Sequence, residues 1–221
     1  MILVGLTGGI GSGKSSVSHR LSGRGAVIVD ADAIVKDLQG PGTSLLAALA
    51  DRFGARIITE SGALDRAALA GLVFSDTQAL ADLNALVHPA VAQEMNRRID
   101  AEFNSDRMVV LDIPLLAENP RKGLAAVIVV DCPIEVAVHR LTTQRGFTED
   151  DARSRVSRQA TREQRRALAT HIIDNAGSLI DLDRQIDTLW DELGQLPATT
   201  IEDLARYRAT TSKRRADPGP P

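Results

Sequence analysis

The chain has 221 residues, of which 43% are hydrophobic and 25% are charged, and this composition is typical of a globular protein and excludes a disordered chain. At about 150 residues per domain, the length excludes an array of several domains. The formal net charge of −3 and the aromatic content of 3% argue against a surface that binds DNA or RNA.

The first residues carry no basic signal region, and no run of about 18 apolar residues follows them. The single cysteine, Cys132, excludes an internal disulfide and is typical of a reducing compartment. We therefore expect a cytoplasmic protein that binds neither nucleic acids nor membranes, and we predict a monomer.

The first thirty residues predict a strand, a helix and a second strand. Residues 2–6 are an apolar run that ends in a glycine cluster, residues 15–21 have helical character, and residues 26–29 are another apolar run. Such a βαβ unit implies two parallel strands with a right-handed crossover. We therefore expect an α/β fold with a central parallel sheet.

Residues 33–104 contain almost no strand signal, and their apolar residues recur at helical spacing. Turns are predicted at residues 40–42 and 60–62, and Asp65 is placed to cap a helix that begins near residue 66. His88 and Pro89 are expected to close one of the helical segments.

Residues 108–111 and 127–130 are continuous apolar runs that predict central parallel strands. Each run is followed by an acid, Asp112 or Asp131, so we expect both carboxylates at the ends of adjacent strands. A helix is predicted over residues 133–145.

The last part of the chain predicts helices and one more strand. Residues 147–169 are polar, arginine-rich and helical, residues 172–173 predict a strand, and residues 180–193 predict an amphipathic helix. Beyond Gly194 the pattern weakens to a short helix near residues 201–207 and a basic run at residues 213–215. We interpret residues 195–221 as a flexible C-terminal tail.

One motif indicates a phosphate-binding loop. The run Gly8-Gly-Ile-Gly-Ser-Gly-Lys-Ser15 matches G-x-x-x-x-G-K-[ST] without a mismatch and lies between a predicted strand and a predicted helix. Its glycines let backbone amides converge on a phosphate, while the lysine adds a positive charge and Ser15 is placed to bind Mg²⁺. The predicted ATP contacts in the loop are Gly9, Gly11, Ser12, Gly13, Lys14, Ser15 and Ser16.

The motif alone does not identify the class of nucleotide-binding protein. The Asn-Lys-x-Asp tetrapeptide that guanine-specific GTPases need is absent from the sequence. A dinucleotide-binding fingerprint is also absent, because Ser16 stands where G-x-G-x-x-G would need its last glycine.

Asp30 and Asp32 follow the second predicted strand, at the edge of the sheet where open α/β folds bind ligands. A hydroxyl that attacks phosphorus needs a carboxylate to orient it and to accept its proton. We assign this role to Asp32 and treat Asp30 as a supporting group. The alternative is that both acids only cap the next helix.

Residues 140–166 contain eight arginines and no lysine. This imbalance predicts a lid whose guanidinium groups close over a triphosphate, neutralise the transferring phosphoryl group and exclude water. Arg140, on the helix before the lid, is the arginine that we expect at the phosphates. Ordinary solvent-exposed helix faces are the alternative explanation for the others.

Asp112 and Asp131 are both candidates for an acid that holds a magnesium-bound water. We prefer Asp112, and together with Ser15 it makes Mg²⁺ the expected cofactor of ATP.

These features predict phosphoryl transfer from ATP to a small hydroxyl acceptor without identifying the acceptor. A nucleoside, nucleotide or shikimate-type kinase would share the loop and the lid. A nucleotide-gated regulatory protein, which closes on ATP without transfer, is the alternative from another class. Asp32 argues against it because a switch needs no acceptor base.

The order of elements resembles the dephospho-CoA kinase family. The resemblance covers residues 2 to about 193 and rests on Gly5–Ser15, Asp30–Ile34, Leu86–Pro89, Asp112–Leu116 with Glu118, Val129–Asp131, Arg140 with Arg145, Arg155–Gln159 and Ile173–Gly177. It implies a P-loop NTPase fold in one kinase domain over residues 1–194. The core then comprises about residues 1–32, 105–145 and 170–194, with a helical substrate-binding insertion at about 33–104 and a helical lid at about 146–169.

The resemblance also implies ATP-dependent phosphorylation of the 3′-hydroxyl of the ribose of dephospho-CoA, which yields coenzyme A and ADP. By position, Asp32 corresponds to the catalytic base, Lys14 to the phosphate ligand and Arg140 to an essential arginine beside the lid. His88, Pro114 and Leu115 correspond to substrate-binding elements. The segment after about residue 194 has no counterpart that we can assign.

Overall fold

The computed structural model of the chain describes residues 1–212. Its contacts define two compact units. The first comprises Met1–Val29 and Ala101–Thr210, and the second is built on Asp30–Asp100. The second unit has nearly the bounds of the helical insertion that the sequence predicts.

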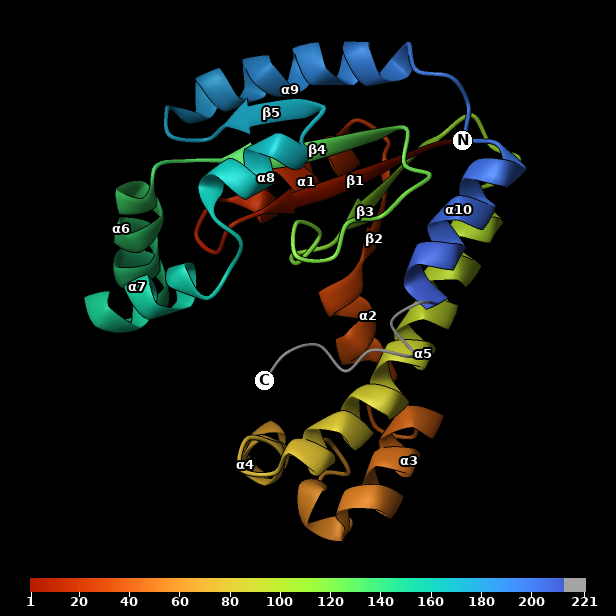
Figure 1. Cartoon of the computed structure of the whole chain (residues 1–221), viewed down its shortest axis with the longest axis vertical. Helices are drawn as coiled ribbons and strands as arrows, with labels where there is room; N and C mark the ends of the chain where they lie inside the picture. Colours follow the sequence, from red (N-terminus) through yellow and green to blue (C-terminus); the bar gives the residue numbers. More distant parts are fainter. Residues whose placement is uncertain (213–221) are drawn as a thin grey trace. The chain divides into compact units, whose positions relative to one another are not determined.

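The first unit is built on a five-stranded sheet in the order β2-β3-β1-β4-β5 (Figure 1). The strands are β1 (Ile2–Gly8), β2 (Val27–Asp30), β3 (Met108–Asp112), β4 (Ala126–Asp131) and β5 (His171–Asp174). β1 is parallel to both β3 and β4, and β4 is parallel to β5. The predicted α/β fold with a central parallel sheet is therefore confirmed.

The strands that end in Asp112 and Asp131 are not adjacent, so that prediction was wrong. β1 lies between β3 and β4, and its Leu6 pairs with Asp112 while its Gly8 pairs with Val130. Parallel neighbours need long crossover connections, so the order of strands along the chain does not determine their order in the sheet. The two carboxylates therefore flank the strand that leads into the phosphate loop.

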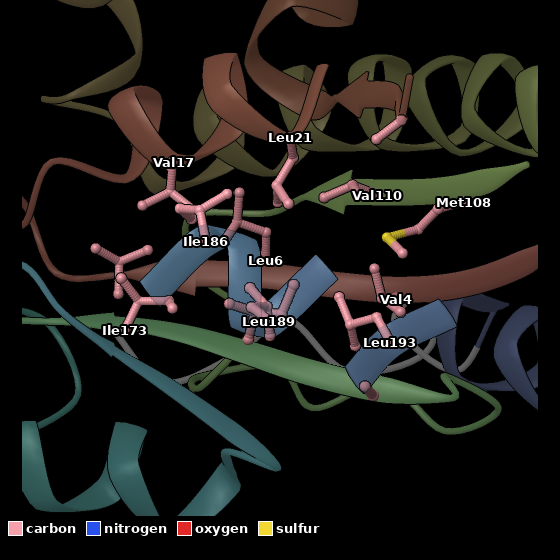
Figure 2. Packing of buried hydrophobic residues seen from close by; sticks show 14 of the residues in the cluster. Val4, Leu6, Val17, Leu21, Met108, Val110, Ile173, Ile186, Leu189 and Leu193 are labelled. Carbon is pink, nitrogen blue, oxygen red and sulfur yellow. The ribbon is translucent and has the colours of Figure 1, made fainter. Parts of the chain in front are cut away.

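One face of the sheet is covered by α1 (Lys14–Gly23) and α9 (Leu179–Gly194). Figure 2 shows the apolar side chains of both helices packed on those of the strands, among them Val4, Leu6, Val17, Leu21, Val110, Ile186, Leu189 and Leu193. Each fully buried aliphatic side chain contributes about 1.5–3 kcal/mol. This packing fixes the start of α1 at the end of β1.

The opposite face is covered by the segment after β3 and by the end of the lid. Leu116 and Leu168 pack there against Val127 and Val129 of β4. The arginine-rich stretch forms two short helices, α7 (Glu149–Ser157) and α8 (Arg162–Leu168), which follow α6 (Ile134–Arg145). Thr148 and Thr161 cap α7 and α8 with their side-chain oxygens, so each of the two helices begins at its own capping residue.

The second unit is helical, as predicted. It contains α2 (Ala31–Leu38), α3 (Ser44–Phe53), a 3-10 turn (Ala55–Ile57), α4 (Arg66–Val73) and nearly all of α5 (Thr77–Ala101). Asp65 accepts a hydrogen bond of 2.9 Å from the N–H of Ala68, which confirms the predicted cap of α4. None of the helices within residues 1–212 is long and apolar enough to cross a membrane.

The helix that contains His88 and Pro89 does not close there, contrary to the prediction. Pro89 lies inside α5 and removes one backbone hydrogen bond, at a cost of about 3 kcal/mol. Leu86, Val87 and Ala90 pack against the core of the second unit, and burial of such side chains offsets that cost. Tertiary packing thus overrides the helix-ending tendency of proline.

Residues 195–212 do not form the flexible tail that we predicted. They form a short connection and α10 (Ile201–Ser212). Thr199 donates its N–H to the carbonyl of Met1 at 3.0 Å and accepts the N–H of Leu3 at 2.8 Å. Leu204 and Tyr207 of α10 are buried. These partners are remote in sequence, so no local pattern indicates them, and the predicted basic run at residues 213–215 lies outside the described part of the chain.

Candidate active site

The phosphate loop joins β1 to α1, and its backbone requires glycine at two positions. Gly13, which directly precedes α1, has a φ of 84°, and Gly11 has a φ of 79°. A Cβ on Gly13 would lie 2.1 Å from Nδ2 of Asn175, and one on Gly11 would lie 2.7 Å from the carbonyl oxygen of Ala137. The loop therefore closes tightly and presents its amides at the start of a helix, where anions are favoured.

Polar side chains from three other segments hold the loop. Asn175, just after β5, donates to the carbonyl of Ser12 at 2.7 Å, and Arg140 of α6 donates to the same carbonyl at 3.4 Å. Arg140 also donates to the carbonyl of Asn175 at 2.7 Å. The N–H of Ile10 donates to Oε1 of Gln159, in the lid, at 2.8 Å. Arg140 thus contacts the loop backbone, and its contact with the phosphates stays a prediction.

Lys14 and Asp112 form an ion pair between the first turn of α1 and the end of β3. The Asp112 side chain is only 3% exposed, so the charge of Lys14 compensates a carboxylate that is nearly removed from water. Close by in the chain, the hydroxyl of Thr7 donates to the carbonyl of Pro114 at 3.0 Å, which ties the segment with Pro114 and Leu115 to β1. A phosphate-loop lysine and an acid suited to the metal side of a nucleotide site are therefore in contact.

Asp131, the other candidate for the metal-side acid, is bound to the lid instead. Its carboxylate accepts hydrogen bonds from Arg162 at 2.8 and 3.1 Å (Nε) and 2.8 Å (Nη2), and from Arg166 at 2.6 Å. Burial alone would raise the pKa of Asp131, but the hydrogen bonds from the two guanidinium groups hold it below its usual range. Asp131 is therefore an ionised carboxylate that holds two arginines. The assignment of Asp112 to the metal stays a prediction.

A pocket that is partly open to solvent lies between the phosphate loop, the end of β4 and the lid. Gly9 and Ser12 line it on the loop side, and Gln159 and Arg165 line it on the lid side. The hydroxyl oxygen of Ser12 is buried without a hydrogen-bond partner within residues 1–212, which leaves a polar group for a ligand in this pocket. The free thiol of Cys132 also lines the pocket, and burial raises its pKa, which fits a small packed side chain better than a nucleophile.

The donor set at the loop fits a magnesium ion that arrives with a nucleotide. Ser15 is exposed in the first turn of α1, and Asp112 ends β3 beside Lys14. Mg²⁺ keeps several waters and uses one or two protein oxygens together with phosphate oxygens. Within residues 1–212 no group of three or more His, Cys, Asp or Glu residues is placed to hold a metal ion.

The remaining predicted site residues belong to the second unit. Asp30 caps α2 by accepting the N–H of Ala33 at 3.0 Å, so the capping alternative applies to Asp30. Asp32 is exposed in the first turn of α2, and His88 is exposed on α5.

Four polar residues organise this region; sequence reasoning assigned no role to three of them and only a candidate metal role to Asp131. Asn175 and Gln159 bind the loop backbone, Asp131 binds two lid arginines, and Glu118 accepts the N–H of Ala160 at 2.7 Å. All four lie in stretches that carry the family resemblance. That is the signal that could have identified them, although it does not state what they contact.

Comparison with known proteins identifies the family. The family model for dephospho-CoA kinase matches residues 2–181. This chain belongs to the dephospho-CoA kinase family. The resemblance found in the sequence is thereby confirmed, and the chain is a kinase of coenzyme A biosynthesis rather than a nucleotide-gated regulatory protein.

Relatives in this family match over most of the chain. The dephospho-CoA kinase of Thermobifida fusca is 48% identical over 197 residues, which cover 87% of this chain and 96% of that protein. The dephospho-CoA kinase of Streptomyces avermitilis is 46% identical over 197 residues, which cover 87% and 94%. Among solved structures, TT1252 from Thermus thermophilus superposes with a TM-score of 0.73 at 34% identity, covering 87% of this chain and 97% of the other.

Proposed function

We propose that this chain transfers the γ-phosphoryl group of ATP to the 3′-hydroxyl of the ribose of dephospho-CoA and releases coenzyme A and ADP. The observation that carries the proposal is the glycine-constrained phosphate loop, with Lys14 at the start of α1, in a chain of the dephospho-CoA kinase family.

Binding of ATP is assigned to the loop and to one arginine beside it. The backbone amides of residues 9–16 surround the phosphates, and Lys14 and Arg140 add positive charge. The guanidinium of Arg140 contacts the carbonyl of Ser12, so its other N–H groups also lie close to the loop. In the transition state these groups neutralise the charge that spreads over the phosphoryl oxygens.

Ser15 and Asp112 would hold Mg²⁺, Ser15 directly and Asp112 through a bound water. When bound, the ion neutralises the phosphates and orients them for in-line transfer. The ion pair with Lys14 keeps the Asp112 carboxylate at the loop.

Asp32 is proposed as the base that accepts the proton of the attacking hydroxyl. Its exposed carboxylate follows the end of β2 by two residues, and the helix cap there is made by Asp30 instead. Because Asp30 makes the cap, the exposed carboxylate of Asp32 is available for an acceptor. His88, Pro114 and Leu115 are proposed as contacts of the dephospho-CoA substrate.

The test is mass spectrometry of products after incubation with Mg-ATP and a mixture of dephospho-CoA, shikimate, pantothenate and nucleosides. We expect only dephospho-CoA to gain one phosphoryl group, and phosphorus NMR of the product should place it on the 3′-oxygen. Phosphorylation of another acceptor, or of the 2′-oxygen, would contradict the proposal.

The role of Asp32 is tested by Asp32→Asn, with the exposed acid Asp51 of α3 changed to Asn as the matched control. We expect Asp32→Asn to lower kcat by about 100-fold or more with ATP affinity nearly unchanged, and Asp51→Asn to behave as the parent. A large loss of ATP affinity in Asp32→Asn would assign this residue to the metal and not to the acceptor.

We also propose that the enzyme works as a monomer in the cytoplasm. Light scattering of the purified chain at assay concentration checks the first point, with a mass near 23.6 kDa expected. Fractionation of cells that express the tagged chain checks the second.

A further inference from the structure

Asp131 and two arginines of α8 form a charge cluster at the end of β4. The Asp131 side chain is 4% exposed, while those of Arg162 and Arg166 are 34% and 46% exposed. Arg162 contacts both carboxylate oxygens, at 2.8 Å each, and Arg166 contacts one of them at 2.6 Å. Because these arginines lie four residues apart on one helix, the single carboxylate fixes α8 in rotation as well as in position.

Arg165, the arginine between these two in sequence, points elsewhere. The guanidinium of Arg165 packs on the phosphate loop, with Nη2 only 2.8 Å from where a Cβ of Gly9 would lie. Arg165 also lines the pocket that Gly9 and Ser12 share, and it donates to the carbonyl of Ala160. Gln159, just before α8, accepts the N–H of Ile10. α8 and the residues before it thus present an arginine and a glutamine to the loop.

We propose that Asp131 is a positioning residue of the kinase: by holding Arg162 and Arg166 it fixes α8 so that Arg165, alone among these three arginines, contacts the polyphosphate of the bound nucleotide. The assignment of the ligand as a nucleoside triphosphate rests on the proposed function. The sequence treats the lid arginines as equivalent, whereas the structure separates one that faces the loop from two that bind a carboxylate.

The geometry of the cluster indicates that Asp131 keeps its two arginines bound when ATP binds, and does not release them. Both oxygens of Asp131 accept from guanidinium groups, and separation of the pair would leave a buried carboxylate without compensation, which is costly. Two arginines and one aspartate still leave one positive charge in excess, so the cluster supports rather than opposes a phosphate nearby.

The test uses four variants and the parent. Arg165→Ala removes the proposed contact, Asp131→Asn removes the anchor charge at constant size, and the double variant combines them. Arg153→Ala is the matched control, because Arg153 is an exposed lid arginine whose partners are Glu135 and Glu149. Dissociation constants for Mg-ATP, without acceptor, are measured by calorimetry, and KM and kcat are measured with dephospho-CoA.

We expect Arg165→Ala to weaken Mg-ATP binding and raise KM for ATP by about tenfold or more, and Arg153→Ala to stay within about twofold of the parent. Asp131→Asn should have a smaller effect, and the double variant should bind ATP no more weakly than Arg165→Ala, because Asp131 acts through Arg165. Effects that multiply in the double variant, or an Arg165→Ala variant that binds as the parent does, would overturn the proposal.

A further variant, and the fact that calorimetry is done without acceptor, keep the proposal testable. If Asp131→Asn unfolds, the variant with Arg162→Lys and Arg166→Lys keeps both charges while breaking the two-pronged contact, and the same dependence on Arg165 is expected. The calorimetric arm uses no dephospho-CoA, so a wrong acceptor assignment would abolish turnover in the parent chain while the difference in ATP binding between variants remained measurable.

Discussion

The carboxyl end of β1 leads into the phosphate loop, whereas its amino end is covered by the segment that precedes α10. At the first end lie glycines with positive φ and the buried ion pair of Lys14 with Asp112. Both features lower stability relative to an ordinary turn and an apolar core, since glycine loses more entropy on folding and buried charges lose hydration.

At the amino end, burial and long-range hydrogen bonds stabilise the strand. Leu3 lies one residue before the first pair of β1 with β4, and its N–H is bound by the hydroxyl of Thr199 at 2.8 Å. Tyr207 is 1% exposed, and Arg121 donates to the carbonyl of Thr210 at 2.9 Å. One strand therefore has the groups for catalysis at one end and stabilising contacts at the other. Variants at the first end should change catalysis, and variants at the second end should change the free energy of unfolding.

The largest effect is expected at the carboxyl end. Lys14→Ala should lower kcat at least about 1000-fold, on the order of 4 kcal/mol, because the charge on the transferring phosphoryl group loses its main protein cation. Steady-state kinetics measured per folded molecule check this expectation.

Lys14→Ala also removes the ion pair with the buried Asp112, so the stability of this variant is expected to fall as well. Lys14→Arg retains a cation there and serves as the companion variant, while the exposed Lys122→Ala is the control for loss of a lysine. Turnover near that of the parent in Lys14→Ala would refute the assignment of the site.

The next effect is expected at the amino end. Tyr207→Ala should lower the free energy of unfolding by about 3 kcal/mol, because a large buried side chain leaves a cavity. Denaturant unfolding measures it, and Ile201→Ala, at a position 73% exposed in the same helix, should change it little. The kcat of the folded fraction should stay at the parent value, and a loss of kcat matching that of Lys14→Ala would show that the two ends are not separable.

The sequence predicted the carboxyl end well because its signal is local. Eight consecutive residues specify the loop, and the apolar runs on either side specify the strand and helix that position it. Lys14 and Asp112 could be placed there because they follow from the motif and from the end of a strand, whereas Arg140, inside α6, was proposed from its position toward the lid and from the family resemblance.

The amino end could not be predicted in the same way. Thr199 and Leu3 are 196 positions apart, and neither has a local pattern that indicates the other. The helix that contains Tyr207 was expected only as a short element in a flexible tail, because its two buried side chains form too narrow a stripe to predict packing.

The role of Asp131 was missed for a third reason. An acid at the end of a parallel strand suits a metal-bound water as well as an arginine, so residue type alone does not decide. The spacing of Arg162 and Arg166 held a usable signal, since arginines four apart share a helix face and can converge on one carboxylate. The partner itself follows only from the fold.

A third prediction concerns alkaline pH at the amino end. Burial raises the pKa of Tyr207 to about 12 from an ordinary value of 10.0. The stability that the neutral phenol contributes is therefore fully present below about pH 10 and is lost as pH rises toward 12, by about 2 kcal/mol. Unfolding free energies at pH 8 to 12 should show this loss in the parent chain and a smaller loss in Tyr207→Phe. Identical curves would contradict the burial of this side chain.

The smallest effect is expected for the hydrogen bond that joins Thr199 to β1. Thr199→Val keeps the shape of the side chain but leaves the N–H of Leu3, at a fully buried position, without its acceptor. An unsatisfied buried donor costs about 1–2 kcal/mol, so the free energy of unfolding should fall by that amount. The matched control is Thr188→Val, which removes an exposed hydroxyl bound to the carbonyl of Arg184 within α9.

Since Leu3 and the phosphate loop occupy opposite ends of β1, kcat and KM should not change in Thr199→Val. Amide exchange at Leu3 should quicken while exchange at the loop stays constant. Faster exchange at both ends would mean that the strand opens as one cooperative unit, and the division of β1 into a stabilising end and a chemical end would then be wrong.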